Sequence, residues 1–77
     1  MKIIGDKLHT ARLLRGWSIS ELAQKSGISA IAISRYEDEI IEPDGETVFT
    51  LACVLQFPIK FFTIPFKDKL VVKNTFF

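Results

Sequence analysis

Few side chains in this sequence have a type and a spacing that could do chemistry unaided. His9 has no second histidine near it and Cys53 is the single cysteine, so we expect neither a metal site nor a disulfide. A His-Glu-x-x-His pattern, a P-loop and a Gly-rich dinucleotide turn are all absent, and no base stands beside a nucleophile. These observations predict a protein that is not an enzyme and that uses no cofactor.

The informative residues lie between positions 21 and 37, where small and apolar side chains suit two short helices that cross closely. Ala23 is small where a following helix must approach, and Gly27 permits the positive φ of a tight turn. Ile28 would then plug the inside of the turn, and Ile33 would point from the later helix back into a core. This pattern predicts a helix-turn-helix unit.

Periodicity and capping signals place three helices in the first half of the chain. Gly16 is suited to the left-handed backbone that ends a first helix. Ser18 and Glu21 form a capping-box pattern that starts a second helix, and Ser29 caps a third helix over residues 30–37. The first helix is indicated by apolar residues at core spacing: Ile4, Leu8, Ala11 and Leu14.

Two further helices are predicted in the second half. Asp44 is placed to cap a helix that runs from Gly45 to about Gln56. Because this helix is apolar on nearly every side, we expect it, with Cys53, to be buried on more than one face. Pro58 suits the first position of a short fifth helix that ends near residue 62.

The last third of the chain is rich in aromatic residues. All seven phenylalanines lie from position 49 onward, and residues 70–72 are a short apolar run of strand type. We expect residues 1–63 to form one all-α domain of five helices and residues 64–77 to form a short extended tail or linker. Burying the apolar side chains of the tail is difficult in so small a domain, which favours a homodimer contact there.

Size and hydropathy limit the class of protein. The 77 residues suffice for one small domain, and 48% hydrophobic with 25% charged residues exclude a disordered chain. No apolar run approaches the roughly 18 residues that span a bilayer, and no signal peptide opens the chain. We therefore expect a cytoplasmic protein with no membrane partner.

The spaced residues resemble the lambda-repressor-like (xenobiotic-response-element) helix-turn-helix family, from about Ile4 to Phe62. The resemblance implies a five-helix lambda-repressor-like domain whose third helix enters the major groove of double-stranded DNA. It also implies a bacterial or phage transcriptional regulator, of repressor type, that acts as a homodimer. The matching residues are Arg12, Glu21-Leu22-Ala23, Gly27-Ile28-Ser29, Ile33-Ser34-Arg35-Tyr36-Glu37 and Pro43.

The resemblance carries over to four residues that would face the DNA. Ala30, Ile31, Ser34 and Arg35 share one face of the third helix, because they are spaced i, i+1, i+4 and i+5. The fork of Arg35 would read a guanine edge or grip a phosphate, and Ser34 would bond to a base or to the backbone.

The same resemblance implies contacts with the DNA backbone. The helix N-termini at Ser18 and Ser29 would offer backbone N–H donors to phosphates, and Ile19 lies beside the first of them. Arg12 matches a family arginine that pairs with the glutamate at position 37 and lies close to the DNA backbone. We expect the pair of Arg12 and Glu37 to be chiefly structural.

The sequence departs from the family where DNA contacts should be strongest. Ile19, Ala30 and Ile31 stand where polar residues are common, and they can touch a thymine methyl group but cannot hydrogen-bond a base. The net charge is +4 over residues 1–36, −6 over residues 37–46 and +3 over the rest. Acidic residues near phosphates weaken binding, which favours an alternative function, a protein-interaction module with weak or no DNA binding.

A further resemblance concerns the end of the chain. Residues 57–62, the basic linker after them and Phe76-Phe77 are similar to regulators in which a helix-turn-helix precedes a zinc metallopeptidase domain. This resemblance implies a downstream domain, no part of which lies within the 77 residues.

Overall fold

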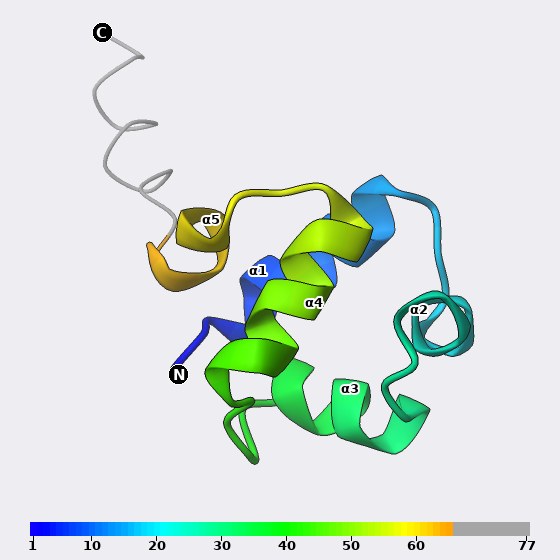
Figure 1. The fold of residues 1–77 in the computed structure, drawn as a ribbon, viewed down its shortest axis with the longest axis horizontal. Helices are drawn as coiled ribbons and strands as arrows, with labels where there is room; N and C mark the ends of the chain where they lie inside the picture. The colour runs from blue at the N-terminus through cyan, green and yellow to red at the C-terminus, as the bar shows by residue number, and fades with distance from the viewer. Residues whose placement is uncertain (66–77) are drawn as a thin grey trace, which may run out of the picture.

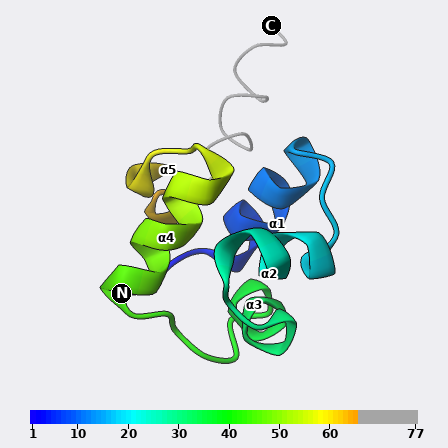
Figure 2. The same ribbon diagram turned by 45° about the vertical axis from the view of Figure 1, so that its right-hand side comes forward.

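A computed structural model describes residues 1–65, which form five α-helices joined by short loops (Figures 1 and 2). The predicted all-α, five-helix fold is confirmed, and no strand occurs within residues 1–65. The predicted tail and its strand-type run at 70–72 lie outside the described residues. The helices are α1 (Gly5–Leu14), α2 (Ile19–Ser26), α3 (Ala30–Glu37), α4 (Gly45–Leu55) and α5 (Ile59–Thr63).

The predicted side-chain caps set the starts of α2, α3 and α4. The Ser18 hydroxyl accepts a hydrogen bond from the Glu21 N–H at 3.0 Å, and the Glu21 carboxylate accepts one from the Ser18 N–H at 2.7 Å. The Ser29 hydroxyl accepts from the Ala32 N–H at 3.1 Å, and Asp44 caps α4 in the same way. Each cap satisfies a backbone donor that the helix leaves open, so the helix starts are decided locally.

Left-handed backbone ends several elements. Gly16 and Gly27 have φ of 78° and 77°, as the sequence predicts for the residues after α1 and at the turn between α2 and α3. Gln56 and Glu39 adopt the same conformation with φ of 62° and 58°, although a Cβ makes it less favourable. Pro58 precedes α5 as its cap and is not its first residue, a one-residue difference from the prediction.

The core is built by apolar side chains from all five helices and the N-terminal segment. α1 contacts α3 and α5, α2 contacts α3 and α4, and α4 contacts α5. α2 and α3 each bury one residue, Leu22 and Ile33, so the rest of these two helices is left partly or fully exposed. In both views α5 lies at the opposite end of the molecule from the pair of α2 and α3. The buried apolar residues are Ile3, Leu8, Ala11, Leu22, Ile33, Val48, Leu51, Ala52, Leu55 and Phe62.

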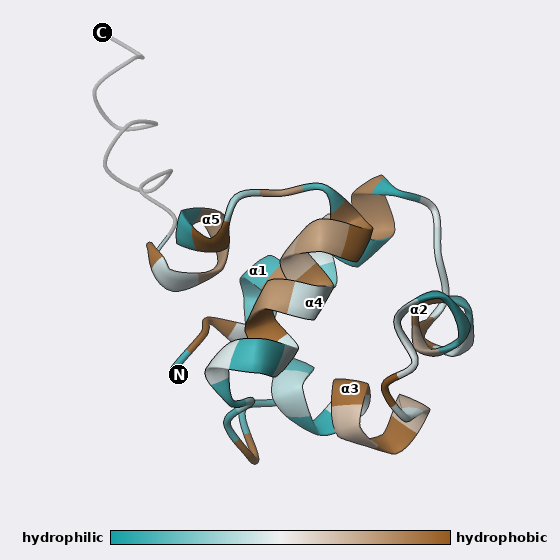
Figure 3. Ribbon diagram, in the orientation of Figure 1, coloured by the Kyte–Doolittle hydropathy of each residue, from teal (hydrophilic) through white to brown (hydrophobic). Residues whose placement is uncertain are grey.

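The prediction that α4 is buried on more than one side is wrong. Phe49 is 59% exposed and Cys53 is exposed as well, although α4 stays mostly apolar beyond its first turn (Figure 3). The reason is geometric, because α4 contacts α2 and α5 along one stripe of buried residues, and the four other short helices leave its opposite side uncovered. Leu14, predicted for the core, is 65% exposed at the last turn of α1. No helix within residues 1–65 has the length and apolar character needed to cross a membrane.

Candidate nucleic-acid interface

The turn between α2 and α3 holds the two helices against the core. Ile33 is fully buried, and Ile28 and Ala23 pack against the core from partly buried positions. Gly27 reverses the chain with its positive φ, and the Ile28 N–H donates to the Ser26 hydroxyl at 3.1 Å. These contacts fix the side of α3 that faces inward and therefore the side that faces solvent.

The outward side of α3 carries the four residues that the sequence places there. Ala30, Ile31 and Arg35 are exposed, with Ile31 exposed by 66%, and Ser34 is half-buried. Ile33 points the other way into the core, which orients the whole helix. The structure thus brings Ala30, Ile31, Ser34 and Arg35 together on one accessible face.

Among residues 1–65, Arg35 differs from the other two arginines in having no partner for its side chain. Arg15 donates to the Leu55 carbonyl at 2.7 Å and lies over the Phe57 ring at 4.7 Å. Arg12 is paired with Glu37, with 2.7 Å between Nε and Oε2. Within residues 1–65, the side chain of Arg35 makes no hydrogen bond or ion pair, so its guanidinium group is available to a ligand.

Arg12 and Glu37 form a buried ion pair between α1 and the last residue of α3. The guanidinium donates through Nε to Glu37 Oε2 at 2.7 Å and through Nη2 to Glu37 Oε1 at 3.0 Å, and it also donates to the Trp17 carbonyl at 2.9 Å. The two side chains are only 8% and 7% exposed. The Arg12 side chain therefore points into the protein, and its bidentate ion pair with Glu37 holds the C-terminal end of α3 in place.

The pair is ionised, because hydrogen bonding outweighs the effect of burial. Burial alone would raise the pKa of Glu37, but hydrogen bonds from Arg12 and His9 bring that pKa below its ordinary value. The hydrogen bond with Glu37 raises the pKa of Arg12. His9 Nδ1 lies 3.0 Å from Glu37 Oε1, a contact that sequence reasoning did not foresee.

The N-termini of α2 and α3 differ in what they offer to an anion. At α2, the Ser18 and Glu21 amides are used by the capping box, and the Glu21 carboxylate lies at this end. At α3, the first turn contains no acidic residue, and the Ala30 and Ile31 amides have no acceptor within residues 1–65. Ile19 is half-buried and packs against the core, so only part of it faces outward.

Comparison with known proteins shows to which family this arrangement of helices belongs. A helix-turn-helix family model matches residues 8–62. The chain belongs to the lambda-repressor-like helix-turn-helix family. A search of curated proteins found no match. Among solved structures, the chain is similar to the P22 c2 repressor protein in complex with synthetic operator 9T in the presence of Tl+, with 25% sequence identity and a TM-score of 0.74 over 82% of this chain and 96% of that chain.

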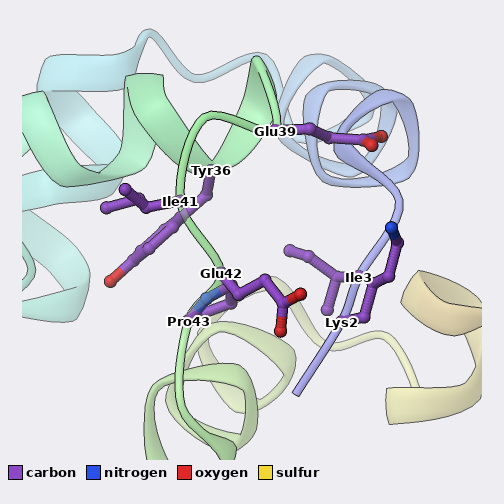
Figure 4. Close-up of a pocket in the computed structure, with 7 residues that line it drawn as sticks. All are labelled: Lys2, Ile3, Tyr36, Glu39, Ile41, Glu42 and Pro43. Carbon is purple, nitrogen blue, oxygen red and sulfur yellow. The ribbon is translucent and has the colours of Figure 1, made fainter.

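In this lambda-repressor-like domain, one residue of the acidic loop makes a contact within the fold that the sequence did not predict. The Gly5 N–H donates to Glu39 Oε2 at 2.8 Å, and Figure 4 shows the Glu39 side chain reaching toward α1. A carboxylate at a helix N-terminus is stabilised by the helix dipole. Glu39 thus caps α1, whose own cap residue Ile4 has no side-chain acceptor, and α1 and α3 are joined a second time.

Gly5 is required at this junction because α1 approaches the end of α3 closely. A Cβ atom on Gly5 would collide with the carbonyl oxygen of Glu37. We expect Gly5→Ala to destabilise the domain by about 1–3 kcal/mol, since the two helix ends must move apart. Urea unfolding followed by circular dichroism measures the change.

Gly45→Ala is the matched control for this substitution. Gly45 is also the first residue of a helix, but a Cβ there would meet no atom within 4 Å. Its replacement should leave the free energy of unfolding equal or slightly higher, because alanine loses less entropy in a helix. Equal effects of the two substitutions would show that the junction of α1 and α3 is not tight.

The helix-turn-helix domain has little room for a small ligand within its described residues. One hollow of about 60 Å³ lies between the N-terminal segment, the end of α3 and the following loop (Figure 4). That volume has room for only a few water molecules and is well below the roughly 300 Å³ of a cofactor pocket. Residues 1–65 contain no group of three or more His, Cys, Asp or Glu that could hold a metal ion. The hollow is lined by Lys2, Ile3, Tyr36, Glu39, Ile41, Glu42 and Pro43.

Proposed function

We propose that the chain is a cytoplasmic transcriptional regulator of repressor type that binds double-stranded DNA as a homodimer, with α3 in the major groove. The observation that carries this proposal is the guanidinium of Arg35 on the outward face of α3, which has no partner within residues 1–65. The guanidinium group of an arginine can donate two parallel hydrogen bonds to the edge of a guanine or to the oxygens of a phosphate. The similarity to a repressor whose structure contains an operator supports the same function.

We assign the residues of the proposed site to three kinds of role. Ser34 and Arg35 are assigned to polar contacts on the outward face of α3. Ser18 and Ser29 start the helices whose backbone amides would meet phosphates, with Ile19 beside the first. We assign Arg12 to positioning α3 through Glu37, because its own side chain is buried.

Dimer formation follows from the small number of contacts that one copy can make. The outward face of α3 offers one unpaired arginine, and the acidic residues Asp38 and Glu42 are exposed beyond its end. Two copies would double the contacts and would read two half-sites about one helical turn apart. We assign the domain to residues 1–63 and the dimer contact to residues 64–77.

A protein-interaction module is the second candidate function. Ile31 and Ile40 are 66% and 67% exposed, and exposed aliphatic side chains of this kind suit a protein partner. The two functions are separated by selecting bound duplexes from a random pool at two salt concentrations. Recovery of a common half-site, with weaker binding at the higher salt, supports DNA recognition. Recovery of no duplex by the folded protein contradicts it and favours the second function.

Arg35→Ala is expected to weaken binding to the selected duplex by about 1–3 kcal/mol, or about 5- to 150-fold in affinity. The free energy of unfolding should change little, because the Arg35 side chain is exposed and makes no hydrogen bond or ion pair within residues 1–65. Fluorescence anisotropy with a labelled duplex measures the affinity.

The variant Arg35→Lys distinguishes the reading of a base from the binding of a phosphate, because lysine keeps the positive charge but lacks the planar guanidinium group. If Arg35 reads guanine, the lysine variant loses discrimination between the selected duplex and a random one. Wild-type affinity in Arg35→Ala would remove the main support for the proposed function.

A further inference from the structure

The C-terminal end of α3 is closed by a turn that keeps Ile40 beside Arg35. The Ile40 N–H donates to the Arg35 carbonyl at 2.9 Å, and the Glu39 N–H donates to the Tyr36 carbonyl at 3.1 Å. Together with the left-handed backbone of Glu39, these two bonds form a Schellman motif. In this motif the side chain after the left-handed residue usually packs toward the last turn of the helix. Ile40 therefore extends the outward face of α3 beyond Arg35.

The extended surface combines exposed apolar groups with both signs of charge. Ile31 and Ile40 are 66% and 67% exposed, and neither packs against the core. Arg35 and Asp38 lie between them in the chain and are exposed as well. Residues three apart are neighbours on a helix surface, yet these two side chains form no ion pair with each other or with any other residue of 1–65. We call Ile31, Arg35, Asp38 and Ile40 the α3 strip.

The order of these groups makes the α3 strip complementary to itself. A two-fold axis that passes between Arg35 and Asp38 places the arginine of each copy opposite the aspartate of the other. The same antiparallel arrangement brings Ile31 of one copy toward Ile40 of the other. DNA, by contrast, could attract Arg35 through its phosphates but would repel Asp38. A second copy of the chain therefore offers a partner to every group of the strip.

We propose that the α3 strip pairs with the same strip of a second copy in a weak, symmetric dimer. Because the strip is small, we place this contact among transient interfaces, which bury less than about 1,200 Å² in total. The dimer covers Ile31 and Arg35 and so excludes DNA from α3, an effect that rests on the proposed function. It differs from the dimer contact proposed for residues 64–77, which leaves α3 free to bind DNA.

Sedimentation velocity of the full chain without DNA, over a range of protein concentrations, measures this dimer. Arg35→Asp and Asp38→Arg each create two like-charge pairs in a symmetric dimer, so each should weaken association by at least about tenfold. The double variant Arg35→Asp/Asp38→Arg restores two opposite-charge pairs, and its association should return toward that of the wild type. Circular dichroism verifies that each variant is folded.

Lys25→Asp is the control for the charge reversals. Lys25 is exposed on α2, where its ammonium group lies over the Trp17 ring at 4.9 Å, and it is not part of the α3 strip. Its replacement should therefore leave association close to that of the wild type. Higher salt should weaken association of the wild type, because the ion pairs of the dimer are at the surface.

Competition with DNA is measured through the exposed Cys53 thiol, which accepts a fluorescent label. Copies that carry a donor dye are mixed with copies that carry an acceptor dye, and energy transfer reports the dimer. A saturating duplex with a single half-site of the selected sequence should abolish the transfer, because it occupies α3 one copy at a time. A dimer formed through residues 64–77 would keep the transfer.

The results separate this inference from the proposed function. Wild-type protein that stays monomeric at every concentration overturns the dimer, as does association that neither charge reversal weakens or that the double variant does not restore. Association that neither reversal weakens would place the contact on another surface. Energy transfer that persists while the half-site duplex is bound also overturns the inference. If no duplex is bound but the charge swap restores association, the proposed function fails and the dimer stands.

Discussion

Replacement of Arg12 by alanine is expected to destabilise the domain by about 3–5 kcal/mol, the typical cost of breaking a buried ion pair from one side. The Glu37 carboxylate would stay buried after losing the two hydrogen bonds that it accepts from the guanidinium. Domains of this kind are stable by about 5–15 kcal/mol in total, so a substantial share of the stability is lost. Urea unfolding followed by circular dichroism measures the change.

A double-mutant cycle is the control for this prediction. Glu37→Ala should also be strongly destabilising, because the Arg12 guanidinium would then be buried with only the Trp17 carbonyl and His9 for partners. The double variant Arg12→Ala/Glu37→Ala removes both charges, and its cost should be clearly less than the sum of the two single costs. Additive costs would mean that the pair contributes nothing beyond the packing of its side chains.

The same pair makes stability depend on pH. Because the pKa of Glu37 is lowered on folding from its ordinary value of 4.5, the unfolded chain takes up this proton first as the pH falls. The stabilisation is complete above pH 4.5 and is lost as the pH falls toward and through the folded pKa. The pKa of Asp44 is lowered as well, by its hydrogen bonds from Thr47, so wild type must be compared with Glu37→Gln. The variant should show a shallower loss of stability in acid, and an unchanged slope would contradict the assignment.

Replacement of Phe62 by alanine is expected to cost about 3–5 kcal/mol, as large-to-small changes of fully buried aromatic residues do. Phe62 is 1% exposed, and its ring meets those of Phe61 and Phe57 edge-on, with ring centroids 5.3 Å and 6.3 Å away. Its carbonyl also accepts a hydrogen bond from the Ile4 N–H at 2.8 Å. Loss of the side chain should therefore loosen α5 from the start of α1.

Phe49→Ala is the matched control, because it makes the same chemical change at an exposed position. Phe49 is 59% exposed on α4, so its replacement should change the free energy of unfolding by no more than about 0.5 kcal/mol. Thermal and urea unfolding of both variants measure the contrast. A large loss in Phe49→Ala would mean that the outer face of α4 is covered in solution.

The elements of the helix-turn-helix could be predicted from the sequence because their signals act within a few residues. The hydroxyls of Ser18 and Ser29 accept hydrogen bonds from N–H groups three residues ahead, and Gly27 adopts its positive φ because it has no Cβ. The inward turn of Ile33 follows from helical spacing once α3 is placed. The four-residue face of α3 was therefore accessible to sequence reasoning before any tertiary contact was known.

The burial of α4 could not be predicted in the same way. Its apolar character on nearly every side indicated burial on more than one face, yet Phe49 and Cys53 are exposed. Hydropathy reports which side chains could be buried, whereas the number and direction of the neighbouring helices decide which of them are. In a domain of five short helices, the buried residues of α4 form a single stripe, which consists of Val48, Leu51, Ala52 and Leu55.

The sequence by itself determined the helices, the turn and the family of this protein, because those depend on local spacing. The family resemblance implied the pair of Arg12 and Glu37, but only the tertiary structure decided how the other charged groups are used. Arg15 finds a carbonyl 40 residues away, and Glu39 caps a helix that begins 34 residues earlier. Such pairings arise from the way the helices pack and leave no local trace in the chain. Pairings within the fold involve Arg12 and Arg15, whereas the described fold leaves the side chain of Arg35 unpaired.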